Sequence, residues 1–177
     1  MDPFETLGVE PRFDLDLTAL EKRHRELSGA LHPDRYTGRP ASERRMALDR
    51  AIKVNEAWRL LRDPVRRAES LLAARGVERD EKSEPKASRG LLMEMMEVRE
   101  ELAEAKAHKD LDALARLGRR MREREGEVLA TLDEGFHDAG NDDAALTALL
   151  PKLGELRYLR RFFEELDAIE EQLLDAL

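Results

Sequence analysis

His32, Pro33 and Asp34 are consecutive in the sequence, and together they could recognise a protein partner. Pro33 fixes its own φ and keeps His32 out of the helical region, so a helix arriving from the N-terminal side must end here. An imidazole and a carboxylate are then expected side by side in an exposed turn, where they can form hydrogen bonds and ion pairs with another protein. We call residues 32–34 the His-Pro-Asp turn.

Two helices are expected to hold this turn between them. Thr18 followed by Glu21 fits a capping box, so the first helix should begin near residues 17–19 and run to Leu31. His24 falls on the apolar side of this helix, where half-buried packing is favoured over a ligand role. The other members of that side are Leu17, Leu20, Leu27 and Leu31. The basic residues that lie off it, and should form an outer face, are Lys22, Arg23 and Arg25.

The second helix should run over about 41–62 and pack antiparallel against the first. A short apolar turn or half-helix over 4–9 opens the chain. A further short helix is expected over 65–75, where Gly76 can supply a left-handed cap. The seam through which the second helix is expected to pack consists of Leu48, Ala51, Ile52, Asn55, Trp58 and Leu61.

The His-Pro-Asp turn and residues 52–68 together resemble a known family. The turn matches the signature of J-domains, which stimulate ATP hydrolysis by DnaK-type chaperones, and 52–68 resembles the end of the long J-domain helix with its following turn. With Asn55 and Trp58 in the helix and Ala68-Glu69-Ser70-Leu71-Leu72 after it, the sequence is most similar to the HscB family, the J-proteins of bacterial iron-sulfur cluster assembly.

The resemblance implies that His32, Pro33 and Asp34 dock on an HscA/DnaK-type chaperone near the interdomain linker of its ATPase and speed hydrolysis. It further implies that Arg25, with Lys22 and Arg23 nearby, supplies long-range attraction to an acidic patch on that chaperone. Without the resemblance, residues 1–76 would indicate a helical hairpin with a proline-marked turn and no stated function.

The composition favours a largely helical protein and excludes several kinds of site. Of the 177 residues, 40% are charged and 5% are aromatic. The absence of cysteine excludes disulfides, cysteine nucleophiles and clusters held by thiolates. The four histidines are scattered, and neither a Gly-rich phosphate loop nor a framed nucleophile is present. We therefore expect no catalytic residues, no metal site and no cofactor.

The charge and the hydropathy narrow the choice of partners. A net charge of -8 argues against nucleic acid, which binds clustered Lys and Arg. No apolar run reaches the roughly 18 residues that a membrane span requires. The N-terminus has neither the basic nor the hydrophobic region of a targeting signal. The sequence therefore predicts a cytoplasmic protein whose partners are other proteins.

Two domains are expected, because the two halves of the chain differ in charge. Residues 1–78 carry a net charge of +1, and residues 79–177 carry -9. Between them, 77–90 is charged, contains a proline and lacks apolar periodicity, which predicts a linker. We therefore assign 1–76 to a J-domain and 91–177 to a C-terminal domain.

The first helix of the C-terminal domain should begin near Ser88, run to about Ala107 and carry two different faces. At about 100° per residue, one side forms a seam that should be buried, composed of Leu91, Met95, Val98, Leu102 and Ala105. The other side combines an apolar trio with an acidic row, composed of Leu92, Met93, Met96, Glu97, Glu100 and Glu104. Either a third helix covers this side, or it is a partner-binding face on which methionines adapt and carboxylates select a basic partner.

Two further helical stretches should complete a three-helix bundle. The first is expected over 109–135, with Leu111, Leu114, Leu117, Met121, Val128 and Leu132 roughly on one side. Its exposed, mixed-charge face should carry Arg119, Arg120, Arg122 and Arg124. A loop over 136–143 leads to the last stretch, 144–177, which Pro151 should kink or break near 149–151. The inner positions of this stretch are Leu149, Leu153, Leu156, Leu159, Phe163, Leu166, Ile169, Leu173 and Leu177.

In the HscB family, the first helix of the C-terminal domain binds the cluster scaffold protein through a Leu-Met pair and a row of glutamates. The resemblance carries this role over to the residues that match, which are Leu92, Met93, Met96, Glu97, Glu100 and Glu104. Tyr158 occupies the place of an aromatic residue that joins the same surface in the family. An IscU-type scaffold protein is therefore the implied second partner.

The sequence predicts an all-α co-chaperone that delivers the scaffold protein to an HscA/DnaK-type chaperone and stimulates its ATPase, without being an enzyme itself. Two alternatives stay open. One is a J-protein with a different client, in which residues 92–104 only pack. The other is a helical adaptor with no chaperone role, in which the His-Pro-Asp turn is accidental.

Overall fold

In the computed structural model, which describes residues 1–77 and 88–175, every regular element is a helix. The predicted all-α fold is confirmed. The chain divides into two compact units, Met1–Glu78 and Arg79–Leu177. Of the expected linker, residues 78–87 lie outside the described residues. Over the two described ranges, no helix is both long enough and apolar enough to pass through a membrane.

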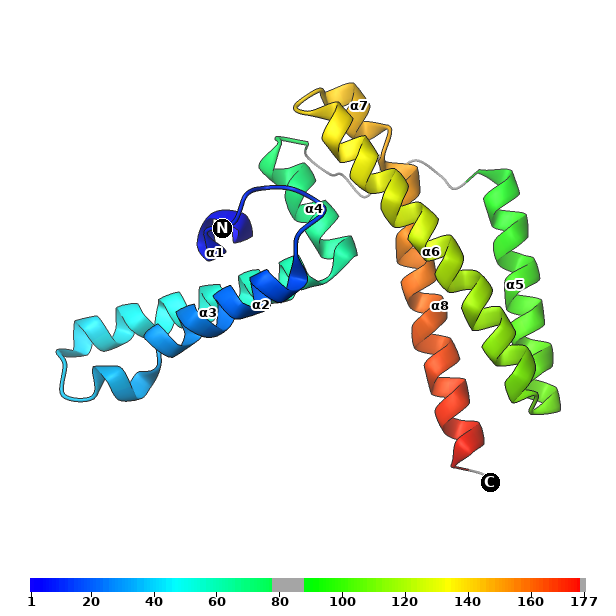
Figure 1. Ribbon diagram of the computed structural model, residues 1–177, viewed down its shortest axis with the longest axis horizontal. Helices are drawn as coiled ribbons and strands as arrows, with labels where there is room; N and C mark the ends of the chain where they lie inside the picture. Colours follow the sequence, from blue (N-terminus) through cyan, green and yellow to red (C-terminus); the bar gives the residue numbers. More distant parts are fainter. Residues whose placement is uncertain (78–87, 176–177) are drawn as a thin grey trace. The chain divides into compact units, whose positions relative to one another are not determined.

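The N-terminal unit is built on a helical hairpin whose tip is the His-Pro-Asp turn. Figure 1 shows α2 and α3 running side by side, with the 3-10 helix η1 at one end of the hairpin and α1 and α4 near the other. Only η1 therefore accompanies the two long helices at the tip. The elements are α1 (Pro3–Leu7), α2 (Leu17–Ala30), η1 (Pro33–Tyr36), α3 (Ala41–Arg62) and α4 (Pro64–Ala74).

The start of α2 matches the expected position but not the expected cap. Asp16, rather than Thr18, is the N-cap residue, and its carboxylate accepts hydrogen bonds from the backbone N–H groups of Thr18 at 2.9 Å and Ala19 at 3.0 Å. Aspartate is as good an N-cap as threonine or better, so it displaces the predicted capping box by two residues. Leu17 is consequently at the fraying end of the helix and is 45% exposed, which corrects its place in the apolar side.

His24 packs as the sequence predicted. Its ring is half-buried and stacks on the indole of Trp58 with centroids 5.2 Å apart, while its Nε2 lies 2.9 Å from Oδ1 of Asn55. The histidine thus ties α2 to α3.

The predicted seam of α3 is partly wrong. Leu48 and Ile52 are 56% and 58% exposed, and the buried side chains of α3 are Ala47, Val54, Ala57 and Leu61. The expectation considered α2 alone, whereas α3 also packs against α1 and α4. The face directed at these two short helices is the one that becomes buried.

The C-terminal unit is a bundle of three long helices with one short helix. Its elements are α5 (Arg89–His108), α6 (Leu111–Ala139), α7 (Asp143–Thr147) and α8 (Leu150–Leu174). In Figure 1, α6 lies between α5 and α8, and α7 connects the far end of α6 to α8. The predicted break in the last stretch is confirmed, because α7 ends at Thr147 and Pro151 lies in the first turn of α8.

Two details of this unit differ from expectation. α6 continues past Gly135 to Ala139, so the expected loop is shorter and Phe136 is buried at 2% exposure. Gly135 lies inside the helix, where the lack of a Cβ makes room for the side chain of Leu149. On α8, Phe162 is buried at 3% exposure where Phe163 was expected.

Candidate functional site

The His-Pro-Asp turn presents its two polar side chains to solvent. His32 adopts an extended backbone (φ -61°, ψ 135°) and begins η1, in which Pro33 occupies the first position. The Asp34 carboxylate lies 3.4 Å from Nδ1 of His32, and the side chains of His32 and Asp34 are 57% and 88% exposed. The arrangement leaves the carboxylate open to a cation or hydrogen-bond donor from another molecule.

The basic face of α2 divides into two kinds of residue. Lys22 and Arg25 are exposed, and Arg25 is 3.5 Å from Glu21 on its own helix. Arg23 is also exposed, yet its Nε donates a hydrogen bond to the carbonyl of Leu7 at 3.1 Å. Arg23 therefore also fastens α1 to α2, a role that the sequence did not indicate.

A groove lies beside the turn, and sequence reasoning missed it. Its volume is about 550 Å³, and it is lined by Leu31, Pro33, Tyr36, Ala41, Arg44, Arg45, Ala47, Leu48 and Ala51. Two of its lining residues, Leu48 and Ala51, belong to the predicted apolar seam of α3, so an apolar surface beside the end of α2 could have been expected. The groove can accept an apolar side chain next to Pro33, between arginines.

The second face predicted from sequence is open on α5. Leu92, Met93 and Met96 are 50%, 55% and 63% exposed, while the opposite side of the helix buries Val98, Leu102 and Ala105. No helix of the described part of the C-terminal unit covers the trio, so the alternative of a third packed helix is wrong for this unit. We call the outward side, with Glu97, Glu100 and Glu104, the α5 face.

The carboxylates of the α5 face are available to a partner. Glu97, Glu100 and Glu104 are all exposed. They lie at intervals of three and four residues, which places them along one side of the helix. Within the described ranges none of them pairs with a cation, so all three carboxylates are open to an incoming basic group.

Tyr158 comes from α8 but contacts α5. Its hydroxyl donates a hydrogen bond to the backbone carbonyl of Met95 at 3.1 Å, and its ring is half-buried. Burial raises the pKa of the Tyr158 hydroxyl, so the group remains a protonated donor at neutral pH. Tyr158 therefore lies against the flank of α5, close to the predicted binding residues.

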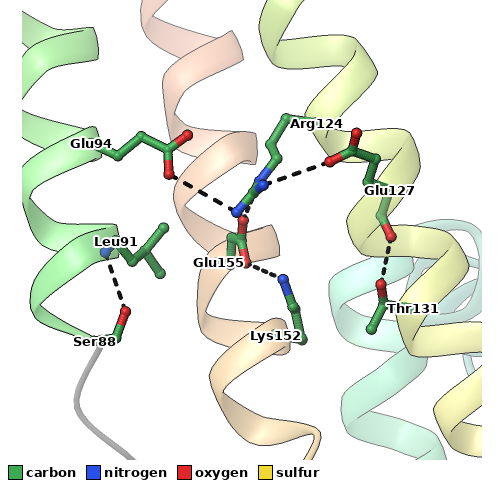
Figure 2. Close-up of polar contacts among 8 residues, drawn as sticks. All are labelled: Ser88, Leu91, Glu94, Arg124, Glu127, Thr131, Lys152 and Glu155. Carbon is green, nitrogen blue, oxygen red and sulfur yellow. Dashed lines mark hydrogen bonds and ion pairs between the residues drawn. The ribbon is translucent and has the colours of Figure 1, made fainter.

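An ionic cluster around one buried carboxylate lies in the same unit, and no sequence pattern pointed to it. Figure 2 shows Glu155 of α8 between Arg124 of α6 and Lys152. The Glu155 carboxylate is 2.6 Å from Arg124 Nε and 2.9 Å from Lys152 Nζ, and Glu155 is only 4% exposed. Arg124 also reaches Glu127 at 3.6 Å and Glu94 of α5 at 4.0 Å. Arg124 is thus a bridge between three helices, which corrects its expected place on an exposed face.

The hydrogen bond that Arg124 donates to the Glu155 carboxylate raises the pKa of Arg124, and the charges of Glu155, Glu94 and Glu127 act in the same direction against desolvation. The guanidinium of Arg124 is therefore held in its charged form by its acidic neighbours. Among the described residues, no group of three or more His, Asp or Glu side chains is arranged to hold a metal ion.

We expect Arg124→Gln to lower the free energy of unfolding of the C-terminal unit by about 3 kcal/mol, because it leaves Glu155 buried with Lys152 as its main remaining partner. Urea denaturation measures this loss. The matched control is Arg120→Gln, which removes an exposed pair with Glu101 at 2.9 Å and should cost less than about 1 kcal/mol. Equal losses from the two variants would contradict a structural role for the cluster.

Comparison with known families accounts for both units. Residues 2–69 match the DnaJ domain, and residues 88–167 match the HSCB C-terminal oligomerisation domain. The His-Pro-Asp turn falls within the first match, and the α5 face and Tyr158 fall within the second.

Individual relatives match over almost the whole chain. A "Co-chaperone protein HscB homolog" of Azoarcus sp. (strain BH72) is 36% identical, over 97% of this chain and 95% of the relative. A protein of the same name from Vibrio vulnificus (strain CMCP6) is 32% identical, over 98% and 99% of the two chains.

Solved structures agree with these matches. The chaperone HscB from Vibrio cholerae is 30% identical and superposes with a TM-score of 0.84, covering 98% of this chain and 99% of that one. The human co-chaperone protein HscB, at 24% identity, has the same fold, with a TM-score of 0.84 over 96% of this chain and 82% of that one. A DnaJ domain followed by an HscB C-terminal domain, in a chain with full-length relatives of that name, shows that this protein belongs to the HscB family of J-domain co-chaperones.

Proposed function

We propose that this co-chaperone delivers an IscU-type scaffold protein to an HscA/DnaK-type chaperone during iron-sulfur cluster assembly and stimulates the chaperone's ATPase. The observation that carries the proposal is the Asp34 carboxylate, 88% exposed at the tip of the hairpin beside His32. Among the described residues its neighbour is the exposed His32, at 3.4 Å, so most of the surface of the carboxylate is open to a partner. The protein acts through the partner's active site and is not an enzyme itself.

The chaperone-binding surface consists of the His-Pro-Asp turn with the basic face of α2. Asp34 makes the central contact with a cation of the ATPase, and His32 and Pro33 fix the backbone that presents it. Lys22 and Arg25, and to a lesser degree Arg23, attract an acidic patch on the chaperone. The groove beside Pro33 accepts an apolar side chain of the same partner.

The scaffold-binding surface is the α5 face. Leu92, Met93 and Met96 form its apolar part, and unbranched methionines adapt to an irregular partner surface. The glutamate row at 97, 100 and 104 selects a partner with basic groups at matching positions. Tyr158 supports this surface from the side.

The charges of α2 should act on the rate of association. Replacing Lys22 and Arg25 together by glutamine is expected to slow association with the chaperone several-fold at low salt, because exposed rim charges steer encounter. The difference should shrink as salt is raised, since the Debye length falls to about 3 Å at 1 M. Stopped-flow association at several ionic strengths measures it, with Arg116→Gln/Arg119→Gln as a control of equal charge in the C-terminal unit. Identical salt dependence in wild type and the α2 variant would rule out steering.

The proposed function is tested by single-turnover ATP hydrolysis of the HscA-type chaperone, with and without the scaffold protein. The wild-type chain should accelerate hydrolysis alone and accelerate it further when the scaffold is present. Acceleration that the scaffold never alters would indicate a J-protein with a different client. No acceleration of either an HscA-type or a DnaK-type chaperone would leave the helical adaptor as the better interpretation.

A further inference from the structure

The first turns of α5 are less firmly packed than the rest of the helix. None of the first nine residues of α5 is buried, and the buried side chains of the helix are Val98, Leu102 and Ala105. Leu91 and Met95, which continue the same seam toward the N-terminus, are only half-buried. Leu92, Met93 and Met96 lie on these same turns. Hydrophobic packing alone therefore holds the apolar part of the α5 face only weakly in place.

Within the described residues, two polar contacts from the neighbouring helices reach this part of α5. The Tyr158 hydroxyl donates to the carbonyl of Met95 at 3.1 Å, and Arg124 lies 4.0 Å from the carboxylate of Glu94. Tyr158, Arg124 and Glu155 line the same narrow crevice between the helices as Glu94 and Met95. Both contacts therefore act on neighbouring residues of α5, within three positions of Leu92, Met93 and Met96.

The partners of these contacts are themselves fixed. Arg124 is held by the buried carboxylate of Glu155 at 2.6 Å, and Glu155 is held on its other side by Lys152 (Figure 2). Tyr158 lies on α8 next to Leu159, which is 1% exposed and anchors that turn of the helix in the core. The side chains that contact α5 are thus themselves held in place by the packing of α6 and α8.

We propose that Tyr158 and Arg124 are positioning residues, which fix the first turns of α5 through Met95 and Glu94 and so preorganise the apolar part of the α5 face for its partner. The consequence for binding rests on the proposed function, whereas the effect on α5 itself does not. Preorganisation strengthens binding because the free protein has fewer conformations to lose. Tyr158 then acts through α5, without a need for its ring or hydroxyl to contact the scaffold protein.

The Tyr158 hydroxyl can be removed without damage to the helix itself. A helical carbonyl accepts its main hydrogen bond from the N–H four residues later and has a second lone pair free for another donor. Tyr158→Phe therefore keeps the ring and the backbone ladder of α5 and deletes only the link from α8.

The test measures amide hydrogen exchange of the free, full-length chain together with binding of the scaffold protein. Tyr158→Phe should speed exchange several-fold at residues 91–97, leave α6 and α8 unchanged, and weaken scaffold binding several-fold. Glu94→Gln, which spares the buried pair of Arg124 with Glu155, should produce a smaller change of the same kind. The control is Thr147→Val on α7, which likewise removes a hydroxyl that donates to a backbone carbonyl, that of Asp143 at 2.7 Å, and should leave both the exchange at 91–97 and scaffold binding unchanged.

The two measurements separate the possible outcomes. Weaker binding with unchanged exchange at 91–97 would mean that the Tyr158 hydroxyl contacts the scaffold directly, and would overturn the positioning role. Faster exchange with unchanged affinity would overturn the claim that preorganisation contributes to binding. If the wild-type chain bound no scaffold protein, the proposed function would fail, and the exchange of the free protein would still decide whether Tyr158 fixes α5.

Discussion

Asp34→Asn is expected to abolish stimulation of the chaperone's ATPase while leaving the fold intact. The substitution keeps the size of the side chain and removes its charge. Without this carboxylate, a cation of the partner is left unpaired in a buried contact. The binding free energy lost is on the order of 2 to 5 kcal/mol, which corresponds to a roughly thirty-fold or larger loss of affinity. Single-turnover hydrolysis with wild type and variant at equal concentrations measures the loss.

A loss of ATPase stimulation by Asp34→Asn can be attributed to the missing charge, because the substitution should leave the protein's stability almost unchanged. Asp34 is 88% exposed, and the neighbour of its carboxylate is His32 at 3.4 Å, which is itself exposed. Its removal should therefore change the free energy of unfolding by no more than about 0.5 kcal/mol. Asp167→Asn, an equally conservative change at an exposed site on α8, is the control and should stimulate like wild type. If Asp34→Asn also stimulated like wild type, the His-Pro-Asp turn would be an ordinary loop.

The helical hairpin could be predicted closely because its limits depend on local signals. Pro33 and the pair Asp63-Pro64 interrupt the helical backbone wherever they occur, and α3 accordingly has the bounds expected from sequence, Ala41–Arg62. The break before α8 at Pro151 follows from the same local rule. Such effects require no knowledge of the surroundings.

Burial could be predicted less well where a helix has more than one neighbour. Leu48 and Ile52 have the spacing of a core seam, yet they are exposed because α1 and α4 cover a different side of α3. The choice between Phe162 and Phe163 on α8 failed for a similar reason, since the two residues differ by about 100° around the helix and only the position of α6 decides between them. The periodicity indicates that a helix is amphipathic, and its neighbours determine which edge of the stripe is buried.

The α5 face and the ionic cluster also differ in how well they could be predicted from the sequence. The α5 face could be separated from the buried seam because two distinct sets of apolar residues occur on one helix. The ionic cluster could not be predicted, because Arg124 and Glu155 are 31 positions apart and each resembles an ordinary surface residue. The link from Tyr158 to Met95, 63 positions apart, is likewise a product of the folded bundle.

The largest effect in the C-terminal unit is expected from Leu92→Ala/Met93→Ala/Met96→Ala, which should reduce scaffold binding by at least about 100-fold. Burying an apolar side chain of this size at an interface contributes on the order of 1 to 2 kcal/mol, and about 2.7 kcal/mol corresponds to a factor of 100. The three side chains are 50% to 63% exposed, so their truncation should hardly change the stability of the bundle. Isothermal titration with the scaffold protein measures the loss.

The same variant distinguishes the two surfaces in the hydrolysis assay. It should stimulate the chaperone normally when added alone and lose only the additional acceleration that the scaffold brings, because the His-Pro-Asp turn is unchanged. Leu174→Ala is the matched control, since Leu174 is 60% exposed on α8 and lies outside the α5 face. Normal scaffold binding by the triple variant would mean that the exposed trio serves another client, and loss of all stimulation would mean that α5 also takes part in chaperone binding. Loss of the scaffold-dependent part alone requires that capture of the client and stimulation of the ATPase reside on separate units of one chain.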